Sequence, residues 1–152
     1  MSGETDLEKL LATISPELMA GEYVFCTFEG AQYGDYADLK PIAAMQESEG
    51  LTLVIDKNTA DEREMVYKPV FMGITLRVHS SLDAVGLTAA FASKLTEHGI
   101  SANVIAGFYH DHLFVPENLA EKAIEALNEL GCLLYTSPSP RDLSTSRMPS
   151  SA

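Results

Sequence analysis

Residues 74–115 read ITLRVHSSLDAVGLTAAFASKLTEHGISANVIAGFYHDHLFV, and this stretch decides the fold. Apolar and polar residues alternate from Ile74 to His79, which predicts a strand with one buried face and one polar face. Apolar residues then recur at every fourth position from Leu87 to Leu95. This spacing predicts a helix, and Gly99 is placed to end it.

The rest of the stretch predicts a hairpin, and a second helix follows it. A strand from Asn103 to Phe108 leads into the turn Tyr109–Asp111, and a partner strand runs from His112 to Val115. A last helix is expected to begin at Pro116 and to end at Gly131. This order is most of a split βαβ unit. We therefore predict an α+β, ferredoxin-like sandwich whose antiparallel sheet has helices on one face.

The part of the chain before Pro69 repeats this order less clearly. It predicts, in turn, a helix from Asp6 to Ser15, a strand from Tyr23 to Phe28, a loop from Glu29 to Asp38, a helix from Pro41 to Glu47, a strand from Leu51 to Ile55 and a short helix opened by Asn58. We expect two degenerate copies of the unit, over residues 1–68 and 69–131. A single copy is the alternative, because the two halves share no residue pattern.

A complete unit of this type has a fourth strand after its second helix, and no such strand follows Leu130. We expect Tyr23–Phe28 or Leu51–Ile55 to complete the sheet instead.

Composition and charge restrict the partners of the chain. Of its 152 residues, 46% are hydrophobic, which is enough for the core of one ordinary domain or two small ones. There are 22 acidic and 10 basic residues and the net charge is −12, so nucleic acid is not an expected partner. No apolar run approaches the roughly 20 residues of a membrane span, and the acidic start has no features of a secretory signal. We expect a cytoplasmic protein without a membrane partner.

The last segment differs from the rest in composition. Residues 136–152, TSPSPRDLSTSRMPSSA, are rich in Ser, Thr, Pro and Arg and too poor in apolar residues to fold. Residues 132–144 resemble translated read-through of a sequencing adaptor. We interpret 132–152 as a disordered, non-native tail, with a genuine disordered tail as the alternative.

The connection between the predicted strand and helix, residues 78–88, has the chemistry of an anion site. A helix N-terminus offers unpaired N–H groups and a partial positive charge, which suit a carboxylate. Asp83 could hold an ammonium group, and Gly86 would let a ligand approach the backbone. The pattern is compatible with an α-amino acid, while ordinary helix capping by Ser80, Ser81 and Asp83 is the alternative.

Three histidines make a second candidate group. In a ferredoxin-like sheet the first and third strands are antiparallel neighbours, which would bring His79 near His110 and His112. Together with Asp111 they could bind a divalent metal or act as a general base. Histidines without a metal are the alternative, and we expect neither a metal nor a cofactor. The chain has no GxGxxG, GxxxxGK[ST], HExxH or GxSxG motif, so the corresponding enzyme classes are not expected.

The phrases HSSLDAVGLTAA, GIS and YHDHLFVP within this region resemble the ACT domain, in particular compact bacterial ACT-like proteins. The similarity extends over about residues 10–130, and GEYVFCTF and EGLTLVI belong to a more divergent copy in the first half. Related modules are the amino-acid-binding regulatory domains of aspartokinases. The resemblance implies ligand binding without catalysis.

Carried over to this sequence, the resemblance implies a ligand site made from two segments, one around the turn and one at the head of the following strand. The residues are His79, Ser80, Ser81, Leu82, Asp83, Val85, Gly86, Leu87, Ile100, Ser101, Ala102, Asn103 and Val104. In pairs of ACT domains the second segment meets the turn of a neighbouring copy, so we expect a homodimer.

The sequence therefore predicts a regulatory module that binds a small amino acid or a similar zwitterion and is not an enzyme. Two alternatives stay open: a small metal-dependent hydrolase that uses His79, His110 and His112, and a scaffold or dimerisation module that binds no ligand.

Overall fold

The computed structural model describes residues 15–77 and 87–136, and its side chains up to residue 130. Four strands form the sheet of what we call the second unit: β1 (Ser15–Leu18), β6 (Phe71–Arg77), β7 (Asn103–Ala106) and β8 (Asp111–Pro116). All neighbours are antiparallel and the order is β7-β8-β6-β1. Ile74 and Leu76 of β6 are buried, as the alternation predicted, but the polar residue between them, Thr75, is buried as well, and only Arg77 is exposed.

Two helices cover one face of this sheet, α3 (Leu87–Glu97) and α4 (Ala120–Thr136), with the short 3₁₀ helix η2 (Glu117–Leu119) before α4. Both helices turn apolar side chains towards the strands, as the fourfold spacing in α3 predicted. Phe91 from α3 and Leu127 from α4 are fully buried against Ile74 and Leu113 of the sheet. This is the core of the second unit.

The first unit consists of residues 23–70 and has the same strand arrangement. Its central strands are β2 (Tyr23–Glu29) and β5 (Gly50–Asp56), and β4 (Ala43–Gln46) pairs with β5 to give the order β4-β5-β2. The short helix α2 (Lys57–Glu62) covers one face, over a core that includes Val24, Leu53 and Ala60. A fourth short strand, β3 (Tyr33–Tyr36), and the 3₁₀ helix η1 (Ala37–Leu39) lie between β2 and β4.

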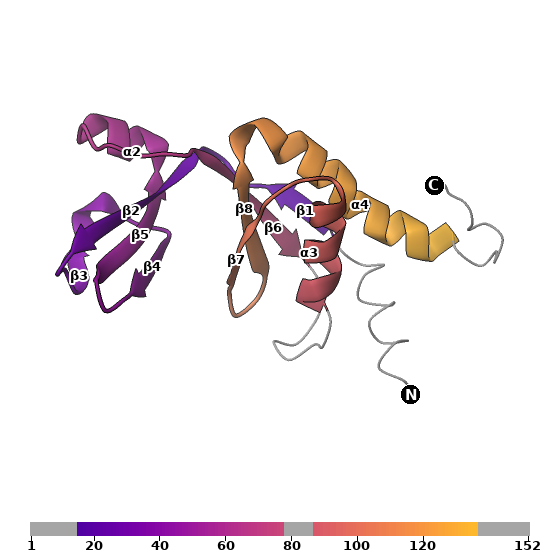
Figure 1. Ribbon diagram of the computed structural model, residues 1–152, viewed down its shortest axis with the longest axis horizontal. Helices are drawn as coiled ribbons and strands as arrows, with labels where there is room; N and C mark the ends of the chain where they lie inside the picture. Colours follow the sequence, from indigo (N-terminus) through magenta and orange to yellow (C-terminus); the bar gives the residue numbers. More distant parts are fainter. Residues whose placement is uncertain (1–14, 78–86, 137–152) are drawn as a thin grey trace.

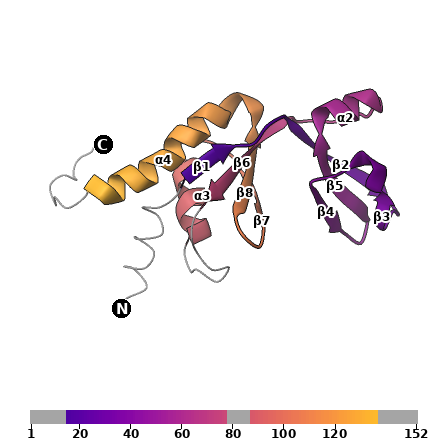
Figure 2. The same ribbon diagram turned by 180° about the vertical axis from the view of Figure 1, so that it is seen from behind.

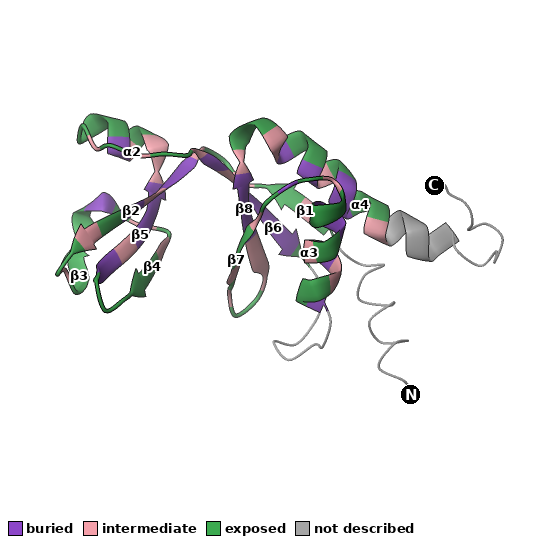
Figure 3. Cartoon of the chain, in the orientation of Figure 1, coloured by how far each residue is buried: buried purple, intermediate pink, exposed green. Residues whose placement is uncertain are grey.

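The two units meet where the chain crosses between them. Tyr23 of β2 pairs with Phe71 of β6, so the strands form one path, β4-β5-β2-β6-β8-β7. Figures 1 and 2 show the two groups of strands joined through this narrow crossing. A third apolar cluster fills the crossing, with Phe114, Val54, Tyr23 and Phe71 buried in it. In Figure 3 the buried residues follow the central strands and the inner faces of the helices.

Several sequence predictions are confirmed and several are wrong. The strands at 23–28 and 51–55 and the helix from Leu87 are confirmed. The helix predicted at Pro41–Glu47 is wrong, because Ala43–Gln46 is the edge strand β4. The loop at Glu29–Asp38 contains a short strand, β3.

Three predicted boundaries also change. The helix α2 is capped by Asp56, whose side chain accepts from the N–H of Asn58, and not by Asn58 itself. Gly131 does not end the last helix, which continues to Thr136. Most of the free edge of β6 pairs with β1, with four residues in register, whereas of the two segments expected there Tyr23–Phe28 reaches β6 only through Tyr23, which pairs with Phe71, and Leu51–Ile55 pairs with β2. The helix predicted from Asp6 lies outside the described residues.

Among the helices in the described ranges, none is long and apolar enough to cross a membrane.

Candidate functional site

Most of the predicted ligand site lies outside the described residues. This holds for His79, Ser80, Ser81, Leu82, Asp83, Val85 and Gly86. The described residues on either side of them are Arg77, the last residue of β6, and Leu87, the first residue of α3. The surroundings of the turn can therefore be described from the elements that lead into it and out of it.

A group of polar side chains lies at the end of β6 from which the turn leaves. The guanidinium of Arg77 donates through Nε to Oε1 of Glu17 on β1, at 2.7 Å. Its Nη1 lies 3.2 Å from Nε2 of His110, which comes directly before β8. Figure 1 shows the β7–β8 turn and the beginning of α3 at this same end of the unit. Arg77, Glu17 and His110 thus border the candidate site.

The contact with Arg77 fixes the proton on the ring of His110. A guanidinium can only donate, so Nε2 of His110 accepts and the ring proton lies on Nδ1. Nδ1 is buried and has no hydrogen-bond partner among the described residues. A buried N–H without an acceptor costs about 1–3 kcal/mol. Among the residues that the structure describes, His110 therefore has a donor without an acceptor, at the end of the sheet where β6 ends.

His112 lies two residues further along, beside Thr75 of β6. Its Nδ1 is 3.2 Å from Oγ1 of Thr75, and the two residues are register partners. Burial, and secondly the charge of His110, lower the pKa of His112, while Asp111 opposes this shift. The ring is therefore neutral at pH 7.

These contacts bear on the metal alternative. Within residues 15–77 and 87–136, no group of three or more His, Cys, Asp or Glu side chains is arranged to hold a metal ion. The Arg77 guanidinium occupies Nε2 of His110, and its positive charge opposes a cation at that nitrogen. The described surroundings of His110 thus suit an anion better than a metal. His79, the third histidine of this alternative, lies outside the described residues.

Leu87 and the segment from Ile100 to Val104 are the described members of the predicted site. The side chain of Leu87 is buried in the core of the second unit, so this residue has only its main chain to offer a ligand. Ile100 is also buried, while Ser101, Asn103 and Val104 are exposed on the way into the edge strand β7. The side-chain amide of Asn103 donates through Nδ2 to the main-chain carbonyl of Phe114 at 3.5 Å.

The described residue that precedes the first segment of the predicted site, Arg77, lies far along the sheet from the second segment, Ile100–Val104. Asn103 of β7 is the register partner of Phe114 of β8, and Phe114 is in turn the register partner of Gly73 of β6. Arg77 lies four residues beyond Gly73, which at about 3.3 Å per residue places it roughly 13 Å further along the sheet. One chain therefore does not bring Ile100–Val104 to the end of β6 from which the turn at 78–86 leaves.

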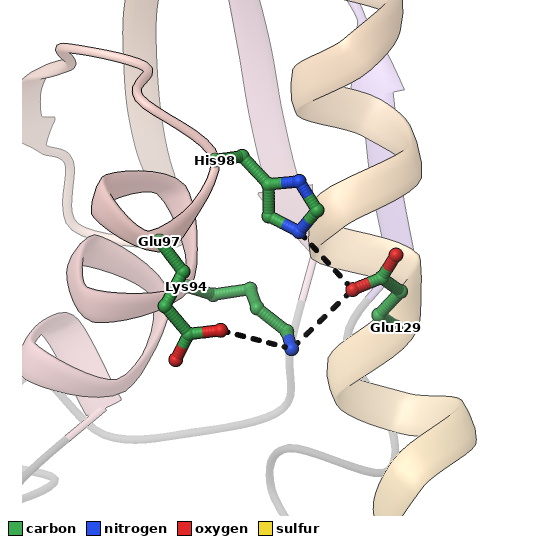
Figure 4. Close-up of polar contacts among 4 residues, drawn as sticks. All are labelled: Lys94, Glu97, His98 and Glu129. Carbon is green, nitrogen blue, oxygen red and sulfur yellow. Dashed lines mark hydrogen bonds and ion pairs between the residues drawn. The ribbon is translucent and has the colours of Figure 1, made fainter. Parts of the chain in front are cut away.

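A different polar cluster lies between α3 and α4 and serves their packing (Figure 4). Lys94 is almost buried, with a side chain 11% exposed, and its Nζ lies 3.3 Å from Glu129 and 3.5 Å from Glu97. Nε2 of His98 lies 3.2 Å from the same oxygen of Glu129. Glu129 on α4 thus holds two side chains of α3.

Replacing Glu129 should weaken this helix pair. In Glu129→Leu the nearly buried ammonium of Lys94 keeps only Glu97, so we expect the free energy of unfolding to fall by about 1–3 kcal/mol. Lys94→Met removes the charge itself and should be close to neutral. Urea denaturation of both variants measures the difference. Equal losses in the two variants would contradict the role assigned to Glu129.

Comparison with known proteins identifies the class to which this fold belongs. A sequence model of the ACT domain matches residues 2–72, and a second model of the ACT domain matches residues 73–129. The chain belongs to the ACT-domain family. ACT domains are regulatory modules that bind small molecules and are not themselves catalytic, and this membership supports such a role here.

Solved structures with the same fold include a close relative. A protein of unknown function from Vibrio cholerae, described as a possible transport protein, is 56% identical with a TM-score of 0.78, over 86% of this chain and 99% of that one. A protein from Agrobacterium tumefaciens is 20% identical, with a TM-score of 0.58, over 78% of this chain and 89% of that one. No curated protein matches the sequence.

The fold is also that of a known regulatory subunit. The ligand-free regulatory subunit of aspartate kinase from Thermus thermophilus is 12% identical, with a TM-score of 0.58, over 76% of this chain and 95% of that one. At this identity the likeness concerns the fold. It confirms the predicted α+β, ferredoxin-like architecture.

Sequence reasoning missed two residues at this end of the sheet, Arg77 and Glu17. Arg77 falls on the polar face of the predicted strand, and it comes directly before the connecting residues 78–86. This signal could have identified it. Glu17 could not be found in this way, because its position beside Arg77 depends on the pairing of β1 with β6.

Proposed function

We propose that this chain is a cytoplasmic regulatory module that binds a small amino acid or a similar zwitterion at the second unit. Its membership of the ACT-domain family supports a regulatory, small-molecule-binding role. The observation that carries the choice of site is the unused donor on His110, next to Arg77, at the end of β6 where the turn begins. The Nδ1–H of His110 can donate to an anion at this end, where the charge of Arg77 is already paired with Glu17.

In this proposal the two ends of the zwitterion have separate partners. The carboxylate accepts from the backbone amides near Val85, Gly86 and Leu87 at the start of α3, and from Nδ1 of His110. The ammonium pairs with Asp83. The turn residues His79 to Leu82 surround the ligand.

We further propose that the active form is a homodimer in which Ile100–Val104 of one chain covers the turn of the other. The distance along the sheet between Arg77, at the end of β6, and Asn103, at the start of β7, supports this arrangement. The edge strand β7 has exposed residues over which a second chain could pack.

Light scattering tests the dimer. The mass of one chain is 16.5 kDa, and we expect about twice this value at micromolar concentration. Asn103→Lys would place a charge in the proposed contact and should shift the protein towards the monomer, whereas Glu49→Lys on the first unit should not. A monomer that still binds an amino acid would place the site within one chain and contradict the dimer.

Thermal stability in the presence of ligands tests the function itself. A ligand that binds only the folded protein stabilises it by about 2.7 kcal/mol at 100 times its dissociation constant. We expect one or a few of the proteinogenic amino acids to raise the melting temperature, and divalent metals to have no comparable effect. Stabilisation by zinc but by no amino acid would favour the hydrolase alternative. A protein stabilised by neither would be a scaffold.

A further inference from the structure

Among the described residues, one edge of β2 in the first unit has no neighbouring strand beyond Tyr23, which pairs with Phe71. Main-chain groups of successive residues in an antiparallel strand point alternately to its two edges. The N–H of Ile42 donates to the carbonyl of Val54 at 2.9 Å, so the main-chain groups of Val54 face β4. Its neighbours Leu53 and Ile55 must then face β2.

This alternation determines which groups of β2 point away from β5. Cys26 and Val24 are the register partners of Leu53 and Ile55, and they use their main-chain groups on β5. Tyr23, Phe25 and Thr27 therefore point to the opposite edge. Tyr23 pairs there with Phe71 of β6. Within the described part of the chain, no strand pairs with Phe25 or Thr27 on that edge.

The second unit shows how the equivalent edge is closed. Each unit contains three neighbouring strands in a corresponding order, β4-β5-β2 in the first and β7-β8-β6 in the second. The last strand of each order is β2 or β6. The next position beside β6 is filled by β1, a four-residue antiparallel strand. The next position beside β2 is filled by no strand among the described residues. Within the described residues, the corresponding edge is therefore paired with a strand in β6 and lacks one beyond Tyr23 in β2.

The segment Met65–Lys68 lies along the open edge but does not close it. Pro69, which follows it, has no N–H to donate to a ladder. Met65 and Tyr67 pack onto the core of the first unit, and the hydroxyl of Tyr67 donates to Asp61 at 2.6 Å. Val66 points away and is 97% exposed. The segment is held by its side chains, and its main chain makes no ladder with β2.

A cavity of about 490 Å³ lies between this segment and β2. It is lined by Phe25, Cys26, Thr27, Met65, Val66, Tyr67 and Lys68. Burial raises the pKa of the Cys26 thiol, so this residue is an apolar wall and not a nucleophile. The cavity therefore combines apolar side chains with four unpaired main-chain groups, the N–H and C=O of Phe25 and Thr27.

We infer that this edge binds an extended peptide segment of a partner protein, which adds to β2 as an antiparallel strand. Residues two apart in the guest exchange both hydrogen bonds with Phe25 and with Thr27. The residue between them lies opposite Cys26, so an apolar side chain there faces Cys26, Met65 and Tyr67, which line the cavity on that side of the strand. The strand β1 on β6 is the pattern for this arrangement, since four residues suffice there.

An extended peptide without charged side chains is the occupant that the lining of the cavity suits. Lys68 is the one charged residue among those that line the cavity.

Hydrogen exchange and peptide titration, followed by NMR on the full chain, test the inference. Without peptide, the amides of Phe25 and Thr27 should exchange about tenfold or more faster than those of Val24 and Cys26. The probe is an acetylated and amidated five-residue peptide of alternating valine and threonine. At millimolar concentration it should shift the Phe25 and Thr27 amide signals and slow their exchange. The same peptide with N-methylated threonines should do neither, because the threonines are the residues that pair with Phe25 and Thr27 and then cannot donate to the edge.

Variants of Thr27 provide the matched control. Thr27→Pro removes the outward N–H and leaves the β5 ladder, so peptide shifts should disappear, whereas Thr27→Val should keep them. If Thr27→Pro does not fold, the N-methylated peptide still decides. Slow exchange of Phe25 and Thr27 without peptide, or equal shifts with both peptides, would overturn the inference. If the Phe25 and Thr27 amides exchange more slowly as the protein concentration rises, without peptide, the edge binds a second copy of the chain. This result would also overturn the inference.

Discussion

Phe114→Ala is expected to lower the free energy of unfolding by about 3–5 kcal/mol, the usual cost of truncating a buried aromatic ring. Phe114 is 2% exposed on β8 of the second unit. Its ring lies edge-on to two rings of β2 in the first unit, Tyr23 and Phe25, each with centroids 5.9 Å apart. The side chain is therefore a contact between the two units, and its loss should also uncouple them. Calorimetry should show two separate transitions where the parent protein has one.

Phe91→Ala is the matched control for this result. Phe91 is fully buried in the core formed by α3, α4 and the second sheet, and it takes no part in the cluster between the units. It should lose a similar amount of stability without uncoupling the units. A single cooperative transition in Phe114→Ala, at a midpoint close to that of the parent, would show that the crossing does not depend on this ring.

Asp83→Asn should weaken amino-acid binding by about 1.5–3 kcal/mol, or roughly 10- to 150-fold in dissociation constant. The proposal gives this carboxylate the ligand ammonium, and a neutral amide cannot replace the charge-assisted hydrogen bond. Titration calorimetry on parent and variant measures the change.

The control for Asp83 is Asp38→Asn, which breaks an exposed ion pair with Arg63 in the first unit. It should leave ligand affinity unchanged, because exposed pairs contribute little and the first unit has no part in the proposed site. If Asp83→Asn binds the amino acid as tightly as the parent, Asp83 is a helix cap and the ammonium has another partner.

The elements that the sequence predicted correctly are those with strong local patterns. The strands at Tyr23 and Leu51 have consecutive β-branched or aromatic residues, and α3 has the fourfold apolar spacing. Ala43–Gln46 has good helix formers but pairs with β5, so tertiary pairing outweighs helix propensity there. Gly131 lies within α4, where the helix continues past it.

The predictions that required distant parts of the chain were the least successful. The pairing of β1 with β6 joins residues about 60 positions apart, and nothing in the pattern of Ser15–Leu18 indicates its partner. Arg77 and Glu17 at the candidate site depend on that pairing. His110 was identified from the strand order alone, but its unused donor follows from its contact with Arg77.

The pairing of β1 with β6 also sets an order of events during synthesis. β1 leaves the ribosome before any residue of the first unit's sheet, yet its partner, Phe71–Arg77, emerges only after that sheet is complete. For this interval the early strand has no lasting neighbour, and the loop that its pairing closes spans an entire folding unit. Formation of the second unit must therefore wait for the first to be translated. Any fragment that starts after Leu18 would present β6 to other chains with a bare edge, which favours aggregation over folding.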